Sequence, residues 1–132
     1  VAVTGIVVDL VLLFSILAFL ATVGREITKG IADVSGDKLK DIKTLAVSKG
    51  CETAAKIAAI FYLLAVVFSL APYILGTVKT LYILIITPVD VGFILLSISI
   101  VKNPSSENAR KVKNLVLALM LLALIGFMVS QL

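Results

Sequence analysis

Four long apolar runs strongly limit the folds open to this chain. They cover residues 1–23, 57–78, 80–101 and 114–132, and only the first and third contain a charged residue, Asp9 and Asp90. A run of about 22 residues extends roughly 33 Å as a helix, enough to cross a hydrocarbon core of about 30 Å. Because backbone groups in lipid must be hydrogen-bonded within their own segment, each run is predicted to be a helix.

Composition agrees with this reading. The chain is 61% hydrophobic and 15% charged, with a mean hydropathy of +1.18, far more apolar than a soluble domain. We predict a single all-α integral membrane domain over residues 1–132, with four transmembrane helices at about 1–23, 53–75, 80–101 and 109–131. Because the chain begins inside an apolar run, without a methionine or a basic leader, we expect either a carboxy-terminal fragment or the ordered part of a longer chain.

The residue types exclude several kinds of chemistry. The chain has no histidine and a single cysteine, Cys51. Histidine proton relays, His/Cys zinc sites, Ser-His-Asp triads and a disulfide framework are therefore excluded for this sequence. Any chemistry must use carboxylates, Lys, Arg, Tyr, Ser or Thr.

The polar link at residues 24–50 carries the strongest candidate site. If its first part is helical, Arg25, Lys29, Asp33 and Asp37 follow one another at i, i+4 steps and stack roughly 5–6 Å apart on one face. Glu26 and Asp33, related by i, i+7, lie on nearly the same side. Carboxylates and cations in this order suit Mg²⁺ and a phosphate, because Mg²⁺ prefers one or two carboxylates together with phosphate oxygens.

Lysine and arginine placement predicts the orientation. The first link is flanked by Arg25, Lys29, Lys38, Lys40, Lys43, Lys49 and Lys56, and the third by Lys102, Arg110, Lys111 and Lys113. The second link, residues 72–79, has Lys79 only. The positive-inside rule therefore puts the first and third links in the cytosol. A simpler reading is that these cations contact anionic lipids; the interspersed acids argue against it for the first link, whereas it stands for the third.

Two acids within the apolar runs leave alternatives open. Asp9 is interpreted either as an interfacial or bundle-paired acid or as part of a functional site. Asp90 follows Thr87-Pro88, where a kink is predicted, and is either functional or bonded to freed backbone amides or a neighbouring hydroxyl. The tyrosines are interpreted as packing residues or interface anchors, not as site residues: Tyr62, Tyr73 and Tyr82.

The polar link resembles a known motif. The sequence R-E-I-T-K-G-I-A-D-V-S-G-D followed by I-K-T-L, within residues 25–47, is similar to the second aspartate-rich motif of the UbiA intramembrane prenyltransferases, and most of all to their archaeal branch. Asp33 and Asp37 match the D-x-x-x-D of that motif. Gly30 and Ala32 depart from it, because relatives often have Asp and Glu there.

The resemblance implies a fold and a set of roles. The fold is a nine-helix bundle to which this chain contributes helices six to nine, while an amino-terminal half supplies a first motif, N-D-x-x-D-x-x-x-D, that this chain lacks. Asp33 and Asp37 would hold Mg²⁺, and Lys29 would act with them in catalysis. The implied substrate-binding residues are Arg25, Glu26 and Lys43.

The implied activity is transfer of a geranylgeranyl group from its diphosphate to geranylgeranylglyceryl phosphate, in the cell membrane and facing the cytosol. The implied partners are these two substrates and membrane lipid, without nucleic acid.

An aromatic acceptor is the main alternative to this activity. A transporter half-domain would explain Asp9, Asp90 and Pro88, and a non-catalytic scaffold is also considered; a CDP-alcohol phosphotransferase is disfavoured because the chain has no Asp-Gly pair. Lys29 could also serve only as an ion-pair partner of Asp33.

Overall fold

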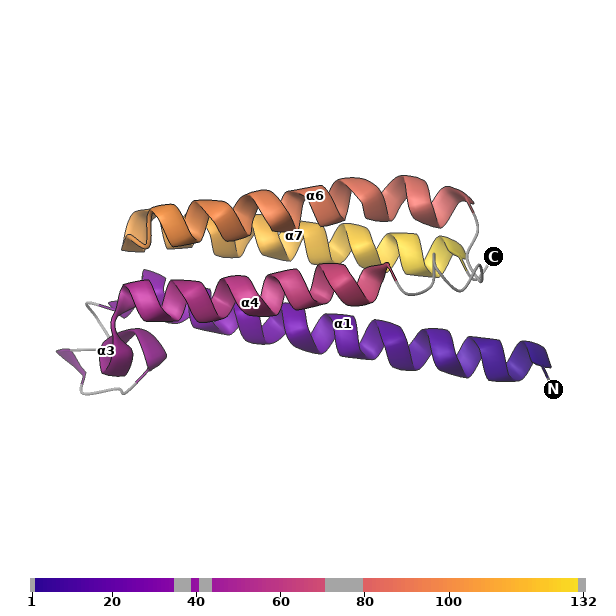
Figure 1. Cartoon of the computed structure of the whole chain (residues 1–132), viewed down its shortest axis with the longest axis horizontal. Coiled ribbons are helices and arrows are strands. Elements are labelled where there is room, and N and C mark those ends of the chain that lie inside the picture. Colours follow the sequence, from indigo (N-terminus) through magenta and orange to yellow (C-terminus); the bar gives the residue numbers. More distant parts are fainter. Residues whose placement is uncertain (1, 35–38, 41–43, 71–79, 131–132) are drawn as a thin grey trace.

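Four long helices lie side by side in the computed structural model (Figure 1). The structure describes residues 2–34, 39–40, 44–70 and 80–130. Its helices, in chain order, are α1 (Ala2–Ala32), the short α3 (Leu45–Lys49), α4 (Cys51–Ser69), α6 (Thr80–Lys102) and α7 (Ser106–Ser130). The helices in contact are α1 with α4, α4 with α6, α6 with α7, and α7 with α1, so the four form a closed ring.

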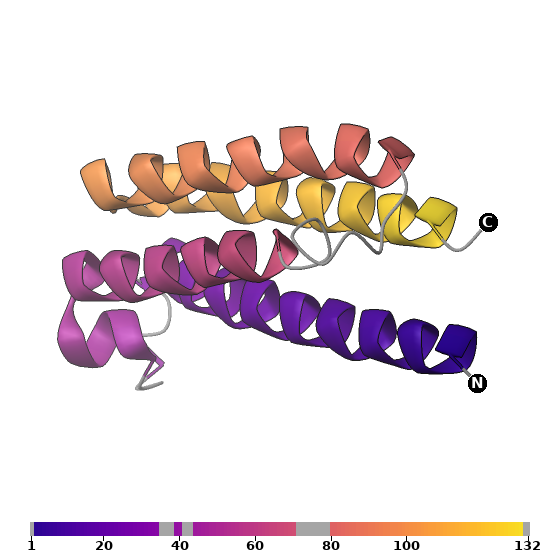
Figure 2. The same ribbon diagram turned by 45° about the vertical axis from the view of Figure 1, so that its right-hand side comes forward.

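The prediction of an all-α membrane protein is confirmed. Four helical segments are long and apolar enough to cross a membrane: Val11–Ala32, Cys51–Ser69, Ile83–Lys102 and Ser106–Val129. The α6 helix continues through Pro88. In Figures 1 and 2, the end of α1, the short α3, the start of α4 and the α6–α7 turn lie at one end of the bundle. The described residues on either side of the two basic links therefore lie at the same end of the bundle.

The predicted boundary of the first helix needs correction. The sequence placed its end near residue 23, whereas α1 continues to Ala32, so that the first part of the link 24–50 is helical. Arg25, Glu26 and Lys29 lower the local hydropathy, but every third or fourth side chain of this part of α1 still faces the bundle. The buried positions along this part of α1 are Gly24, Thr28, Ile31 and Ala32. Packing on one face extends the helix past the apolar run.

The other boundaries shift by smaller amounts. The second helix begins at Cys51 and the fourth at Ser106, slightly earlier than the predicted 53 and 109. Residues 71–75 of the predicted second helix lie outside the described residues. Gly50 separates α3 from α4 with φ +92°, a conformation that favours glycine. At the start of α3, the Thr44 hydroxyl accepts a hydrogen bond from the Val47 amide at 3.3 Å.

The contact between α1 and α4 depends on one tyrosine. Tyr62 of α4 is fully buried, and its ring lies against Gly24, where an added Cβ would be 2.6 Å from Tyr62 Cε1. The Thr28 hydroxyl donates to the Gly24 carbonyl at 2.9 Å. Since its one proton is used there, the Tyr62 hydroxyl donates to Thr28 Oγ1, at 2.6 Å. This geometry supports the interpretation of Tyr62 as a packing residue.

Replacing Gly24 by alanine tests this close approach. We expect Gly24→Ala to destabilise the protein by about 1–3 kcal/mol, because the methyl group overlaps a ring that has no room to move. Gly30→Ala is the matched control in the same helix, since its added Cβ would be 3.5 Å from Thr44, an ordinary contact. That control should be neutral or stabilising by up to about 1 kcal/mol, from helix propensity. Thermal melting in detergent measures both; equal melting temperatures would contradict the account.

Candidate active site

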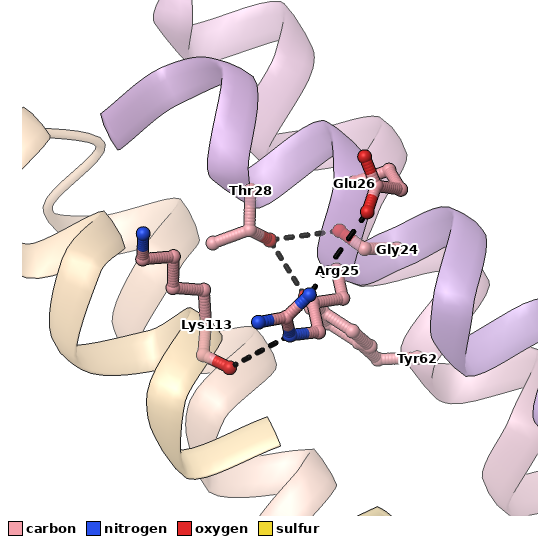
Figure 3. A network of polar contacts seen from close by, with 6 residues as sticks. All are labelled: Gly24, Arg25, Glu26, Thr28, Tyr62 and Lys113. Carbon is pink, nitrogen blue, oxygen red and sulfur yellow. Dashed lines mark hydrogen bonds and ion pairs between the residues drawn. The ribbon is translucent and has the colours of Figure 1, made fainter. Parts of the chain in front are cut away.

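Three contacts hold the last two turns of α1 against its neighbours. Arg25 Nε donates to the carbonyl of Lys113 in α7 at 3.3 Å. Thr28 and Tyr62 join α1 to α4 (Figure 3). The Ser106 hydroxyl, in the first turn of α7, donates to the Ala32 carbonyl at the end of α1. Together these contacts determine which face of α1 is buried.

The face of α1 that these contacts leave free carries Glu26, Lys29 and Asp33. Glu26 and Lys29 are exposed and Asp33 is half-buried. Their i, i+3 and i+7 spacing places them on one side of the helix. The Asp33 amide donates to the Lys29 carbonyl at 3.0 Å, which extends the helical spacing to Asp33. The sequence-based expectation that Lys29 and Asp33 share a helical face is therefore met.

Arg25 does not point with them. Its guanidinium is turned toward α7, and its Nη1 lies 3.9 Å from Glu26 Oε1, the one ion pair among the described residues. At that distance, and with an exposed carboxylate, the pair adds little stability. In the part of the chain that the structure describes, Lys29 and Asp33 form no side-chain ion pair with each other. Asp37 and Lys43 lie outside the described residues.

The surroundings of Asp33 suit a hard cation. Its carboxylate has no side-chain partner in the part of the chain that the structure describes. It stands at the carboxyl end of α1, where unpaired carbonyls give the helix a partial negative charge. Oxygen ligands of this kind fit Mg²⁺. The described ranges contain no group of three or more His, Cys, Asp or Glu side chains able to hold a metal.

A second polar contact, between Asp90 of α6 and Ser69 of α4, lies inside the bundle. Asp90 is 8% exposed, and the Ser69 hydroxyl oxygen is 2.7 Å from each of its carboxyl oxygens. The interpretation in which Asp90 bonds a neighbouring hydroxyl is confirmed. Both residues border a cavity of about 60 Å³ to which all four long helices contribute mainly apolar side chains. Asp9 belongs to α1, and its side chain lies outside the described part.

Sequence reasoning missed Lys113, Ser106 and the Thr28–Tyr62 pair as parts of this arrangement. Lys113 was interpreted only as a lipid contact of the third link. A signal did exist for it: the apolar residues Ala109, Val112 and Val116 recur at i, i+3 and i+7, and this spacing puts Lys113 at the edge of the face of α7 that the structure shows to be buried. The partner contacts themselves join residues 34 to 88 positions apart, which no local pattern reveals.

Four membrane-length helices in a closed ring, with an acid-base face on α1 at one end, define a helical integral membrane protein. The family model of the UbiA prenyltransferase family matches residues 1–125. The chain belongs to this family, as its polar link predicted.

Several similar proteins carry the same name. The chain is 39% identical over 129 residues to the digeranylgeranylglyceryl phosphate synthase of Archaeoglobus fulgidus, covering 94% of this chain and 43% of that protein. It is 31% identical over 125 residues to the synthase of Methanosphaera stadtmanae, covering 95% and 46%. A solved structure concerned with digeranylgeranylglyceryl phosphate synthase in membranes has a TM-score of 0.89 at 31% identity, covering 93% of this chain and 44% of that one. The chain thus spans less than half the length of these relatives.

The Asp90–Ser69 pair gives a test of its structural role. Ser69→Ala should destabilise the protein by about 1–3 kcal/mol, because it leaves a buried carboxyl group without its partner. The double variant Ser69→Ala with Asp90→Leu should recover most of that loss, since removing both partners leaves nothing unsatisfied. Melting temperatures of the single and double variants measure this coupling. A double variant that is no more stable than Ser69→Ala would contradict a purely pairwise role.

Proposed function

We propose that this chain is the carboxy-terminal part of a Mg²⁺-dependent intramembrane prenyltransferase. The reaction moves a geranylgeranyl group from its diphosphate to geranylgeranylglyceryl phosphate, in the synthesis of archaeal membrane lipid. The observation that carries the proposal is the free face of α1, where Lys29 and Asp33 stand without side-chain partners among the described residues. The names of the similar synthases support the choice of substrates.

Asp33 and Asp37 are the proposed ligands of Mg²⁺. When bound, the ion would neutralise the diphosphate and favour its departure from the allylic carbon. Asp33 fits this role, since its carboxylate is reachable and stands at the negative end of α1. Asp37 follows one helical turn later in the sequence and completes the D-x-x-x-D of the family motif.

The cations of the same region are proposed to hold the leaving group. Lys29 lies one turn before Asp33 and is exposed, so its ammonium can reach a diphosphate bound there. Lys43, in the following link, is proposed to add a second positive charge. Charges fixed where negative charge develops give the largest electrostatic contribution to such reactions. Glu26 is proposed to contact substrate from the same face of α1.

The apolar part of α1 gives the prenyl chain a path. Leu12 and Phe19 precede Glu26 and Asp33 at seven-residue intervals, so the four lie on one face of the helix. Leu12 is 60% and Phe19 65% exposed. A hydrocarbon chain that starts at a diphosphate near Asp33 would lie along these side chains. Such a lining excludes water, which would otherwise capture the allylic cation.

The rest of the site is proposed to come from an amino-terminal half with its own aspartate-rich motif, which together with this chain forms a nine-helix bundle. The described cations support a cytosolic position of the site. Those near the α3 end of the bundle are Arg25, Lys29, Lys40, Lys49, Lys56, Lys102, Arg110, Lys111 and Lys113. Their gathering at one end is the pattern that the positive-inside rule assigns to the cytosol.

Removing the Asp33 carboxylate tests the proposal. Asp33→Asn, made in the full-length protein, should lower Mg²⁺-dependent prenyl transfer at least about a thousandfold, because an amide is a poor ligand and carries no charge. It should also abolish the thermal stabilisation that Mg²⁺ gives together with a prenyl thiodiphosphate. Both effects are measured by product formation and by melting in detergent.

Glu107→Gln serves as the control for that variant, since Glu107 is an exposed acid in the first turn of α7 at the same end of the bundle. It should retain the activity and the Mg²⁺-dependent stabilisation of the unaltered protein. An Asp33→Asn protein with full activity would reject the assignment of Asp33 as a metal ligand.

A further inference from the structure

We propose that Arg25 and Lys113 form a second anion site, separate from Asp33, that binds the phosphate group of a lipid phosphomonoester. The inference rests on the proposed function, because that reaction joins two substrates that each carry phosphate. It assigns Arg25 to the acceptor rather than to the departing diphosphate, and it adds Lys113, a residue of a different helix.

The geometry of Arg25 is the first observation. Its Nε donates to the Lys113 carbonyl at 3.3 Å, and its Nη1 is 3.9 Å from Glu26. The hydrogen bond to the Lys113 carbonyl orients the guanidinium toward α7. The remaining Nη2 group has no partner among the residues that the structure describes, and the side chain is 24% exposed. A planar guanidinium with free donors is well suited to phosphate oxygens.

The second observation is the position of Lys113. Its carbonyl accepts the hydrogen bond from Arg25, so the Lys113 side chain starts beside the guanidinium at the contact between α1 and α7, and its flexible stem carries the ammonium away from that point (Figure 3). Lys113 is half-buried, and no carboxylate lies within ion-pair distance of its ammonium in the described ranges. Of the two cations, only Arg25 has a carboxylate near it, the Glu26 oxygen at 3.9 Å. An anion bound at this contact could be reached by both side chains and would offset their positive charge.

The site differs from that at Asp33 in chemistry and in depth. Arg25 precedes Asp33 by eight residues, or roughly 12 Å along α1. A metal-bound diphosphate requires carboxylates, whereas two cations can bind a phosphate directly. Arg25 and Lys113 each lie seven residues from the end of their helix at this side, about 10 Å along the helix axis, and inside the candidate membrane spans Val11–Ala32 and Ser106–Val129. A phosphate at that depth belongs to an amphiphile whose hydrocarbon lies in the membrane.

Replacing the lysine tests this site in the full-length protein in neutral detergent. With saturating geranylgeranyl diphosphate, Lys113→Met should raise the KM for geranylgeranylglyceryl phosphate about tenfold, the size of a lost charge-assisted contact. The donor KM and kcat should change less than twofold. Lys113→Arg should restore the acceptor KM, and Lys111→Met, an exposed cation on the same helix, should leave it unchanged.

An acceptor without phosphate separates this role from a structural one. For the corresponding geranylgeranylglycerol, the unaltered protein and Lys113→Met should have the same KM. An equal rise for both acceptors, or an unchanged KM for the phosphate, would overturn the inference while leaving the proposed function intact. An effect of Lys113→Met that appears only when anionic lipid is added would overturn it in favour of contact with leaflet headgroups. Absence of any transfer by the unaltered protein would overturn the proposed function itself.

Discussion

The packing of the Tyr62 ring against Gly24 sets the orientation of α1 about its own axis, and the position of the polar side chains of α1 depends on it. The ring can approach α1 only because residue 24 has no Cβ, and its hydroxyl bonds Thr28 one turn further along. Gly24 and Thr28 therefore face α4. A helix has one orientation once two such positions are fixed, and Glu26, Lys29 and Asp33 are turned to the opposite side. The polar face proposed as the active site is thus a consequence of buried packing.

This dependence shows what the sequence could predict. Hydropathy indicated the four spanning helices because lipid leaves the backbone no alternative. It misplaced the end of α1 because charged residues mask a buried face at Gly24, Thr28, Ile31 and Ala32. The spacing of Lys29 and Asp33 was correctly read as one helical face. Arg25 departed from that face because a backbone carbonyl, 88 residues away, provides its partner; a spacing rule contains no information about such a contact.

The polar groups inside the membrane are distributed in two ways. Within the bundle they are paired: Thr28 with Tyr62, and Asp90 with Ser69. At the α3 end, Lys29, Asp33 and Lys113 have no side-chain partners in the described part of the chain. Burial explains the difference. A buried polar group without a hydrogen-bond partner lowers the stability of the fold, whereas a more exposed one at the end of the bundle has no such cost and is free to bind a ligand. The unpaired groups are those assigned to substrates and metal in the proposed reaction.

The most direct test of the central claim is a crystal structure of the full-length protein with Mn²⁺ in place of Mg²⁺ and a prenyl thiodiphosphate. The account predicts an anomalous scattering peak within about 2.2 Å of an Asp33 carboxylate oxygen, on the face of α1 opposite Tyr62. A metal bound elsewhere, with the Asp33 side chain directed away from the diphosphate, would contradict it.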